Sequence, residues 1–331
     1  MSSIDKRIDV LDWLGEYMLS EDENWQIVKE RAVLANSWFT TGNIELAVNN
    51  IANSFLQREK LLAWVNNYKI TASPQKLGIV MAGNIPLVGF HDFLCGFITG
   101  HNLMLKLSSK DEVLIRHVIA KIIEWEPAFS SQITIADVIK GCDAYIATGS
   151  NNTARYFEQY FGKYPHIIRK NRTSVAILDG TETKEELSSL ADDIFSYFGL
   201  GCRNVTQVCI PKGYDLNHLL DACSKYADLI LHHKYKHNYD YYLAIYLLNK
   251  VPYLTNDSLL MVENEIPFSA VSVLHYRFYD DVNVITETLS QSDDIQCIIG
   301  HGHLPFGSSQ SPTLSDYADS VDTMQFLSQL S

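Results

Sequence analysis

The sequence predicts an α/β protein, in which two units of alternating strands and helices follow a helical amino-terminal region. From Leu77 onward, short apolar runs are each followed by a longer amphipathic stretch, the pattern typical of strands and helices around a parallel sheet. Before that residue, helix-forming residues dominate, and apolar residues recur at mixed three- and four-residue spacings. A length of 331 residues also suits two domains.

Apolar runs place the expected strands, and amphipathic stretches place the helices. Residues 1–70 form the helical region. The first α/β unit is expected to contain strands at Leu77–Ala82, Asn102–Leu107 and Ala144–Thr148, with helices at 87–99 and 111–125. The second is expected to contain strands at 174–178, 204–211, 258–262, 270–276 and 295–300, with helices at 184–199 and 216–231.

A polar stretch, Arg169–Arg172, separates the two α/β units. We therefore expect one domain over residues 71–168 and a second over residues 169–300. The tail, residues 301–331, is expected to cross back to the first of these domains.

The charge balance limits the partners of this chain. With 26 basic and 39 acidic residues, its net charge is −13, so it lacks the basic surface that nucleic acids and anionic membranes attract. No window approaches the ~20 apolar residues that cross a bilayer. The amino terminus carries acidic residues within its apolar stretch, unlike a secretory signal. We expect a cytoplasmic protein that neither binds nucleic acid nor spans a membrane.

Six cysteines are scattered along the chain without a CxxC pair, so they indicate neither a disulfide framework nor a zinc site. Five of them are expected to fill core positions, as buried thiols usually do. The sixth, Cys202, follows two glycines in FGLGC and precedes a predicted strand. Glycines permit the unusual dihedrals of a turn that presents a nucleophile. Taken alone, the segment favours a cysteine packed at a strand edge.

Asn84 lies in VMAGNIPLVGF, after a buried strand and before a predicted helix with Pro86 at its start. Its amide suits either of two roles. It can cap the helix or donate a hydrogen bond to a developing oxyanion. Capping is the favoured interpretation when this segment is taken alone.

The segments GNIP, GHNLMLKLSS, ATGS, GLGC and EIPFSAVSV, in this order, resemble the aldehyde dehydrogenase superfamily. The resemblance is closest to its fatty acyl-CoA reductase branch, the LuxC-like reductases of bacterial bioluminescence systems, whose ending is similar to YADSVDT here. It covers the chain from about Leu77 to the carboxyl terminus. It implies an aldehyde dehydrogenase-like fold with two Rossmann-like domains, residues 71–168 binding the cofactor and residues 169–300 carrying the nucleophile.

The resemblance also implies a role for each matching residue. Cys202 would be the nucleophile, and the Asn84 amide and the Cys202 backbone N–H would stabilise the oxyanion. The residues implied to bind the cofactor are Lys106, Ser108, Thr148, Gly149, Ser150 and Glu265. The EIPF segment lacks the Gly-Pro that follows the glutamate in the family. Arg203 and a local helix dipole are candidates for lowering the pKa of Cys202.

One departure from the superfamily bears on the reaction. The segment whose glutamate activates the hydrolytic water is replaced near Arg169–Arg172, where no carboxylate remains. Without that base a thioacyl enzyme would be poorly hydrolysed, so transfer between CoA and aldehyde becomes the natural chemistry. The basic residues of this stretch either attract CoA phosphates or form a solvated surface run.

The implied function is the NAD(P)H-dependent reduction of a fatty acyl-CoA thioester to an aldehyde through a thioacyl-cysteine. NADPH is favoured over NADH because Ser109, beside Lys110, stands where NAD-selective members often place a glutamate. Two alternatives remain. The substrate could be an acyl phosphate or an aldehyde, or the fold could be an inactive scaffold that binds a partner, such as an acyl-activating enzyme. Association of the chain with copies of itself is compatible with each of them.

Two further groups of residues invite a functional interpretation. His232, His233 and His237 contain an i, i+4 pair that could bind a metal on a helix. The tyrosines from Tyr235 to Tyr246 could line an acyl-chain groove. Packing is the expected role of both groups, and His301 and His303 are expected to be ordinary exposed loop residues. We therefore expect no metal site.

Overall fold

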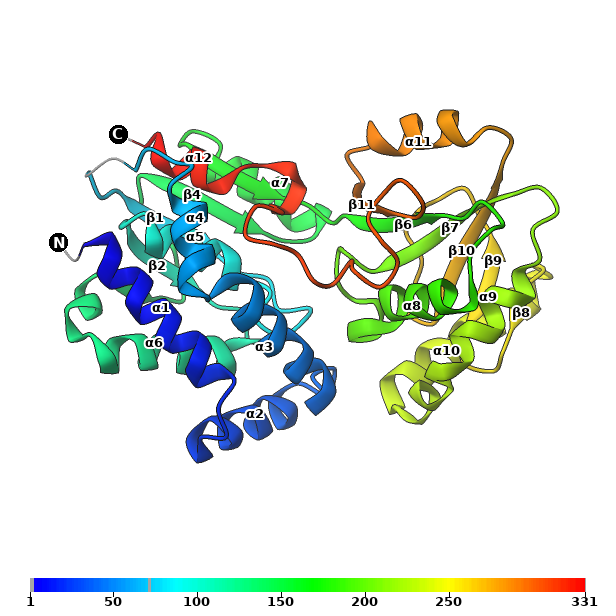
Figure 1. The fold of residues 1–331 in the computed structure, drawn as a ribbon, viewed down its shortest axis with the longest axis horizontal. Coiled ribbons are helices and arrows are strands. Elements are labelled where there is room, and N and C mark those ends of the chain that lie inside the picture. The colour runs from blue at the N-terminus through cyan, green and yellow to red at the C-terminus, as the bar shows by residue number, and fades with distance from the viewer. Residues whose placement is uncertain (1–2, 71–72, 331) are drawn as a thin grey trace. The chain divides into compact units, whose positions relative to one another are not determined.

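The computed structural model describes residues 3–70 and 73–330 (Figure 1). The chain divides into two compact units. One consists of Met1–Asn171 together with Pro312–Ser331, and the other of Arg172–Ser311. The first division falls within the polar stretch at residues 169–172, and the chain returns to the first unit at Pro312, later than the expected residue 301.

Four helices form the amino-terminal part of the first unit: α1 (Ile4–Met18), α2 (Glu23–Ala35), α3 (Thr41–Phe55) and α4 (Arg58–Val65). The side chains of Ser3, Asp22 and Thr40 cap the first three, each accepting a backbone N–H of the first turn. Apolar side chains from all four helices join the core beneath the first sheet. The helical region is therefore part of the first unit and not a separate body.

The first sheet is wholly parallel, with strand order β3-β2-β1-β4-β5. Its strands are β1 (Lys76–Val80), β2 (Asn102–Lys106), β3 (Ile133–Ile135), β4 (Ala144–Thr148) and β5 (His166–Arg169). Its helices are α5 (Phe90–Ile98), α6 (Glu112–Trp125) and α7 (Asn151–Phe161), with a 3₁₀ turn at Pro127–Ser131. The chain proceeds from β1 to one side and then crosses to β4 on the other, so β1 and β4 flank the point where strand order reverses.

The second sheet has the order β11-β6-β7-β10-β9-β8 and is parallel except for β8. Its strands are β6 (Thr173–Ile177), β7 (Val205–Pro211), β8 (Leu254–Thr255), β9 (Leu260–Glu263), β10 (Val273–Tyr279) and β11 (Ile295–Ile299). Its helices are α8 (Lys184–Phe195), α9 (Leu216–Cys223), α10 (His233–Asn249) and α11 (Val282–Ser290), with 3₁₀ turns at Ser196–Gly199 and Ser224–Leu231. The helix expected to reach residue 199 ends at Phe195, because Tyr197 and Phe198 have positive φ.

The carboxyl-terminal tail packs on the first unit through a 3₁₀ turn at Ala318–Ser320 and α12 (Thr323–Ser328). The buried Tyr317 hydroxyl accepts a hydrogen bond from Trp64 Nε1 at 2.9 Å and lies 2.7 Å from the Tyr68 hydroxyl. Tyr68 in turn donates to Asp322 at 3.0 Å, and Asp322 caps α12. The YADSVDT motif is thus the segment that attaches the tail to the amino-terminal helices.

Arg169 makes the second attachment of the tail. It is the last residue of β5 and is only 3% exposed. Its guanidinium is paired with Asp92 at 2.7 Å and donates to the Ala318 carbonyl at 2.6 Å and to Thr323 Oγ1 at 2.8 Å. Neither role expected for the basic stretch, CoA attraction or surface solvation, therefore applies to Arg169.

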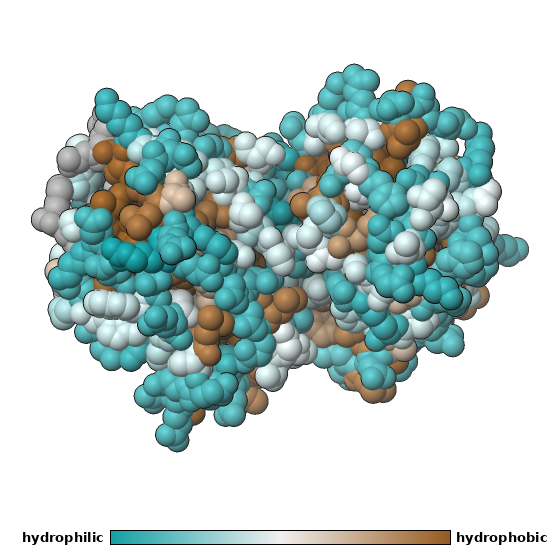
Figure 2. Space-filling model, in the orientation of Figure 1, coloured by the Kyte–Doolittle hydropathy of each residue, from teal (hydrophilic) through white to brown (hydrophobic). Residues whose placement is uncertain are grey.

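On the face shown in Figure 2, the surface of each unit is mainly hydrophilic, and apolar residues lie in separate patches. Exposed apolar residues occur on α10, where Leu247 and Leu248 are 58% and 82% exposed. Among the helices described, none combines the length and the apolar run that a membrane crossing requires.

Candidate active site

The carboxyl edge of the first sheet collects three of the predicted site segments. Lys106 ends β2, Thr148 ends β4, and Asn84 follows β1, the strand between them. The strand register pairs Val80 of β1 with Lys106 on one side and with Ala147 on the other. Ligands of open α/β sheets bind outside the carboxyl ends of the strands where strand order reverses. The predicted residues of this unit therefore meet at the edge that favours a cofactor.

Asn84 is exposed, in the turn that leads from β1 to α5. It does not cap α5, because that helix begins at Phe90 and Gly89 holds its N-cap position without a side-chain bond. Pro86 likewise lies in the turn and not at the helix start. The chain delays its entry into the helix because Leu87 has a φ of +56°, outside the helical region. The expectation that Asn84 caps this helix is wrong.

The turn after β1 packs tightly on the segment that follows β2. A Cβ on Gly83 would lie 2.5 Å from Ser108 Oγ, so no other residue fits at position 83 without displacement. Ser108 Oγ accepts the Lys110 backbone N–H at 3.3 Å. Ser108 is thus held against the turn that carries Asn84. The strand before that turn, β1, lies between β2 and β4, the strand that ends at Thr148.

The Thr148–Ser150 segment joins β4 to α7. Ser150 is the N-cap of α7, and its hydroxyl accepts the Thr153 backbone N–H at 3.3 Å. A Cβ on Gly149 would lie 3.0 Å from both Phe157 and Thr153, so glycine keeps the backbone close to the helix start. The first turn of α7 carries no acidic residue. These features fit a dinucleotide pyrophosphate, which favours the free N–H groups and positive dipole of a helix N-terminus.

Cys202 lies in the second unit, in the turn immediately before β7, and is partly exposed. Three consecutive residues with positive φ, Tyr197, Phe198 and Gly199, turn the chain away from α8 before it reaches this cysteine. Ser174 of β6 donates its hydroxyl proton to the Cys202 carbonyl at 3.1 Å. Cys202 therefore sits on a constrained turn at the amino-terminal edge of the second sheet, as a presented nucleophile requires.

Asn204 holds this turn, and sequence reasoning missed it. Its side chain is fully buried, and its Oδ1 accepts the Gly201 N–H at 2.8 Å. Its Nδ2 donates to the carbonyls of Asp193 at 3.0 Å and Ser196 at 2.8 Å, at the end of α8. One amide thus ties the end of a helix to the nucleophile turn, using its donor and acceptor together. An asparagine two residues after a Gly-Cys pair was the available signal.

The other cysteines differ in exposure. None of the six forms a disulfide within the described residues. Cys95, Cys142, Cys209 and Cys223 are buried, as expected, but Cys297 on β11 is partly exposed. Arg203 Nη1 donates to Cys297 Sγ at 3.2 Å. The expectation of a core position is therefore wrong for Cys297, and sequence reasoning did not connect Arg203 with it.

Glu265 lies in the loop between β9 and β10. Its carboxylate is 80% exposed and pairs with Arg277 of β10 at 3.2 Å. Arg277 pairs with Cys209 in the interior of β7, and its Nε donates to the Cys209 Sγ. Cys202 lies before the first residue of β7. The structure thus places Glu265 beside Arg277 of β10, in a loop whose Pro267 carbonyl accepts a hydrogen bond from Thr206 at the start of β7.

The segment rich in histidine and tyrosine forms α10, with His232 at its N-cap position. His232 caps this helix, and the rings of His233 and His237 lie 4.0 Å apart on adjacent turns. Tyr235 and Tyr239 are buried, whereas Tyr241 is 60% exposed. Packing is confirmed for the buried tyrosines.

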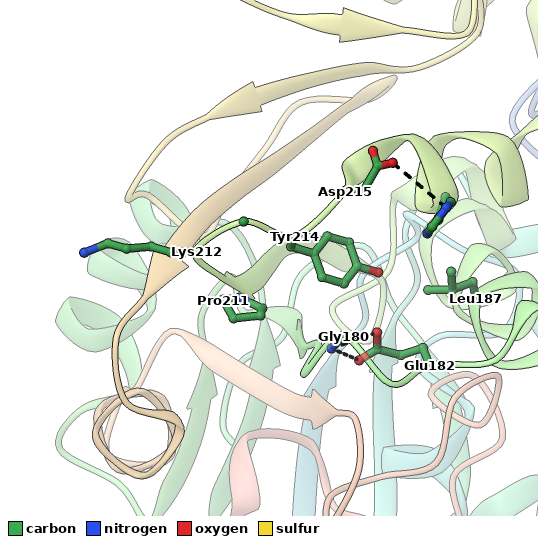
Figure 3. A pocket seen from close by; sticks show the side chains of 9 residues that line it. Gly180, Glu182, Leu187, Pro211, Lys212, Tyr214 and Asp215 are labelled. Atoms are coloured by element: carbon green, nitrogen blue, oxygen red, sulfur yellow. Dashed lines mark hydrogen bonds and ion pairs between the residues drawn. The ribbon is translucent and has the colours of Figure 1, made fainter.

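A pocket of about 280 Å³ opens at the carboxyl edge of the second sheet, the edge opposite Cys202 (Figure 3). The Tyr214 side chain lies along it, with its ring between Asp215 and Glu182. Burial raises the pKa of the Tyr214 hydroxyl, and the neighbouring Glu182 carboxylate adds to the shift. The residues that line the pocket are Gly180, Glu182, Leu187, Pro211, Lys212, Gly213, Tyr214, Asp215 and His218.

Beside this pocket, Asp179, Glu182 and His301 place ligand atoms within 4.8 Å of one another. His301 Nδ1 lies 2.8 Å from Asp179, and its Nε2 lies 3.1 Å from Glu186. Glu182 accepts the backbone N–H groups of Asp179 and Gly180. Because each group already has a hydrogen-bond partner, an imidazolium between carboxylates accounts for the arrangement. His301 is thus a structural ion-pair residue, not an ordinary loop histidine.

The ion pairs of His301 predict a pH-dependent stability. Hydrogen bonds to Asp179 and Glu186 raise the pKa of His301 to about 9 from 6.5. The stabilisation is fully present below pH 6.5 and is lost as the pH rises through about 9. Its size should be about 0.5–1 kcal/mol, because solvent screens exposed pairs. Thermal melts between pH 6 and 10 should show a steeper loss in the wild type than in His301→Gln, and parallel curves would refute the pairing.

Each of the two α/β units is built on a mainly parallel sheet. The second sheet carries the cysteine turn, and the first has the start of α7 at its carboxyl edge. This is an aldehyde dehydrogenase-like fold, and solved structures of aldehyde dehydrogenases match it. Aldehyde dehydrogenase 21 from Physcomitrella patens, in complex with the product succinate, matches 96% of this chain and 82% of its own, with a TM-score of 0.70 and 12% identity. An NADP-dependent glyceraldehyde-3-phosphate dehydrogenase from Bacillus halodurans, complexed with NADP, matches 90% of this chain and 74% of its own, with a TM-score of 0.60 and 14% identity. Aldehyde dehydrogenase C from Pseudomonas syringae, a variant complexed with NAD⁺ and octanal, matches 90% and 72%, with a TM-score of 0.63 and 12% identity.

The chain belongs to the acyl-CoA reductase (LuxC) family, whose sequence profile matches residues 43–217, more than half of the 331 residues. No curated protein sequence matches the chain significantly. The family resemblance and the fold class expected from the sequence are both confirmed. Together they support an acyl reductase or related oxidoreductase activity.

Proposed function

We propose that this protein reduces a fatty acyl-CoA thioester to an aldehyde with NADPH, through a thioacyl intermediate on Cys202. The observation that carries the proposal is the constrained, partly exposed Cys202 turn, held by Ser174 and Asn204, in a chain of the acyl-CoA reductase family. NADH is the alternative cofactor.

In the proposed reaction, the Cys202 thiolate attacks the thioester carbonyl and the bond to the CoA sulfur breaks, so that CoA leaves as a thiolate that takes up a proton. The Asn84 amide and the Cys202 backbone N–H donate hydrogen bonds to the oxyanion that forms during this attack. The bound nicotinamide cofactor supplies the hydride that reduces the thioacyl group. The resulting thiohemiacetal on Cys202 breaks its carbon–sulfur bond, which releases the aldehyde and restores the thiolate.

The first sheet fits the proposed cofactor. The start of α7, with Thr148, Gly149 and Ser150, would hold the pyrophosphate through backbone N–H groups. Lys106, at the end of β2, and Ser108, just beyond it, would meet the adenosine ribose. Glu265 is proposed for the nicotinamide ribose, and its exposed carboxylate would have to leave or share its contact with Arg277.

The test of the proposed function is NADPH consumption across acyl-CoA chain lengths, with acyl phosphates and free aldehydes as the competing substrates. Turnover with acyl-CoA and aldehyde as the product is expected. Activity with an acyl phosphate or with aldehyde oxidation alone would instead support the alternative substrates. The absence of activity with every substrate would support the inactive partner-binding scaffold.

Cofactor preference gives a prediction for Ser109, which is exposed after β2. The Ser109→Glu variant should raise the dissociation constant for NADPH more than that for NADH, because the carboxylate would repel a 2′-phosphate and could bind ribose hydroxyls. Titration of both cofactors measures the two constants. Equal shifts would mean that the Lys106–Lys110 segment does not face the adenosine ribose.

A further inference from the structure

Asp111 is a buried carboxyl group behind the turn that carries Asn84. It is 6% exposed and occupies the N-cap position of α6, yet its side chain makes no capping hydrogen bond there. Instead it accepts the backbone N–H groups of Leu87 and Val88. Its Oδ1 atom is buried without a hydrogen-bond partner among the described residues. Buried polar groups are usually hydrogen-bonded. A buried carboxyl group that does not cap its own helix and has one unpaired oxygen therefore needs an explanation.

The two N–H groups that Asp111 holds belong to the strained part of the turn. Leu87 has a φ of +56°, a left-handed conformation that is unfavourable for a residue with a Cβ. Its side chain is 2% exposed and packs in the core, so the side chain is fixed in place while the backbone adopts the left-handed conformation. Such strain persists only where surrounding contacts determine the conformation. The Asp111 carboxyl supplies two such contacts.

Close packing connects Asp111 with the rest of the turn. A Cβ on Gly83 would lie 3.2 Å from the Asp111 Cβ and 2.5 Å from Ser108 Oγ. The Asp111 backbone N–H also donates to the Ser108 carbonyl at 3.0 Å. Burial raises the pKa of Asp111 well above its usual value, against the effect of the N–H bonds from Leu87 and Val88. Asp111 therefore lies against both ends of the turn, with its Cβ near Gly83 and its carboxyl group at Leu87 and Val88.

We propose that Asp111 is a positioning residue, which holds the Gly83–Val88 turn through the N–H groups of Leu87 and Val88 and so aims the Asn84 amide at the oxyanion. This inference rests on the proposed function of Asn84. Asp111 touches no reacting atom and acts only through the turn.

The test compares Asp111→Ala with Asp111→Asn, which keeps an oxygen acceptor of the same shape. In the alanine variant, kcat for acyl-CoA should fall about 10-fold or more, because a small displacement of a catalytic donor is costly. KM and cofactor affinity should change little. The asparagine variant should stay within about 3-fold of wild type. Asp22→Ala, which removes the N-cap of α2 in the same unit, is the matched control and should lower the melting temperature without changing kcat.

A double-mutant cycle separates positioning from general destabilisation. In an Asn84→Ala background, Asp111→Ala should lower kcat by less than about 2-fold, since the donor it positions is gone. Equal losses in both backgrounds, or an asparagine variant as poor as the alanine variant, would overturn the inference. If Asp111→Ala does not fold, Asp111→Leu takes its place, because leucine keeps the volume and lacks the acceptor.

Amide hydrogen exchange keeps this inference separate from the proposed function. Leu87 and Val88 should exchange at least about 10-fold faster in Asp111→Ala than in wild type, while α8 in the other unit is unchanged. This readout does not depend on acyl-CoA turnover. If the wild type reduces no acyl-CoA, the proposed function fails, and the exchange rates still decide whether Asp111 holds the turn. Unchanged rates at both amides would overturn the role of Asp111 even in an active enzyme.

Discussion

The Cys202→Ala variant is expected to lose acyl-thioester reduction by a factor on the order of 10⁴ or more, because it has no group that can form the thioacyl intermediate. Its affinity for the cofactor should stay nearly unchanged. The proposed phosphate contacts lie at the start of α7 in the first unit, whereas Cys202 belongs to the second. NADPH consumption and a cofactor titration on the same preparation measure the two quantities.

Mass spectrometry locates the intermediate directly. Wild-type protein incubated with acyl-CoA and no cofactor should carry an acyl adduct on Cys202, because reduction of the thioacyl group is blocked. Cys297→Ala is the matched control, since Cys297 is the other partly exposed cysteine and accepts a hydrogen bond from Arg203. That variant should still form the adduct. An adduct confined to Cys297, or turnover by Cys202→Ala, would contradict the assignment of the nucleophile.

The Asn84→Ala variant should lose turnover by about 10²–10³-fold, the usual cost of removing one oxyanion donor. Its stability should change by less than about 0.5 kcal/mol, because Asn84 is exposed and does not cap α5. Attack on the thioester and release of the aldehyde both involve a tetrahedral species. Rapid-mixing measurements of acylation and of aldehyde release should therefore show both steps slowed.

Asn53→Ala is a suitable control for this variant, because Asn53 is an exposed asparagine of the same unit whose side-chain amide donates to the Asn49 carbonyl, within α3. It should change neither melting temperature nor turnover appreciably. An Asn84→Ala protein that melts early yet reduces acyl-CoA at nearly the native rate would assign Asn84 a structural role. The Cys202 N–H would then remain as the sole proposed oxyanion donor.

The expected strands of the first unit were those with strong local patterns. β1, β2 and β4 are apolar runs whose buried residues face helices, and the observed bounds differ from the expected ones by at most two residues at either end. The strands β3 and β5 were not expected, because each has few residues and a mixed polar pattern. Arg169 made β5 look like part of a linker. Its burial depends on Asp92 and on the tail, and both are distant in sequence.

For the candidate site, the segments could be predicted but their internal supports could not. The Gly-Leu-Gly-Cys turn and the Gly-Asn-Ile-Pro turn are local features with visible glycines. The Asn204 amide that secures the first turn bonds to carbonyls at the end of α8, and the Asp111 carboxyl that meets the second bonds across more than twenty residues. Whether Asn84 caps α5 depended on the backbone conformation of Leu87, whose φ is positive. A leucine in the sequence does not predict a positive φ.

By itself, the sequence determined the α/β class, the family and the segments that carry the candidate chemistry, because strand and helix periodicity and glycine-rich turns are properties of neighbouring residues. Only the tertiary structure decided which polar groups are buried and which partners the polar groups meet. Arg169 became an anchor for the tail, His301 an imidazolium between carboxylates, and Asp111 a support for a strained turn. Each of these depends on a partner brought close by folding. For the buried Arg169 and Asp111, that partner, and not the place of the residue in the chain, sets the free energy of the buried polar group.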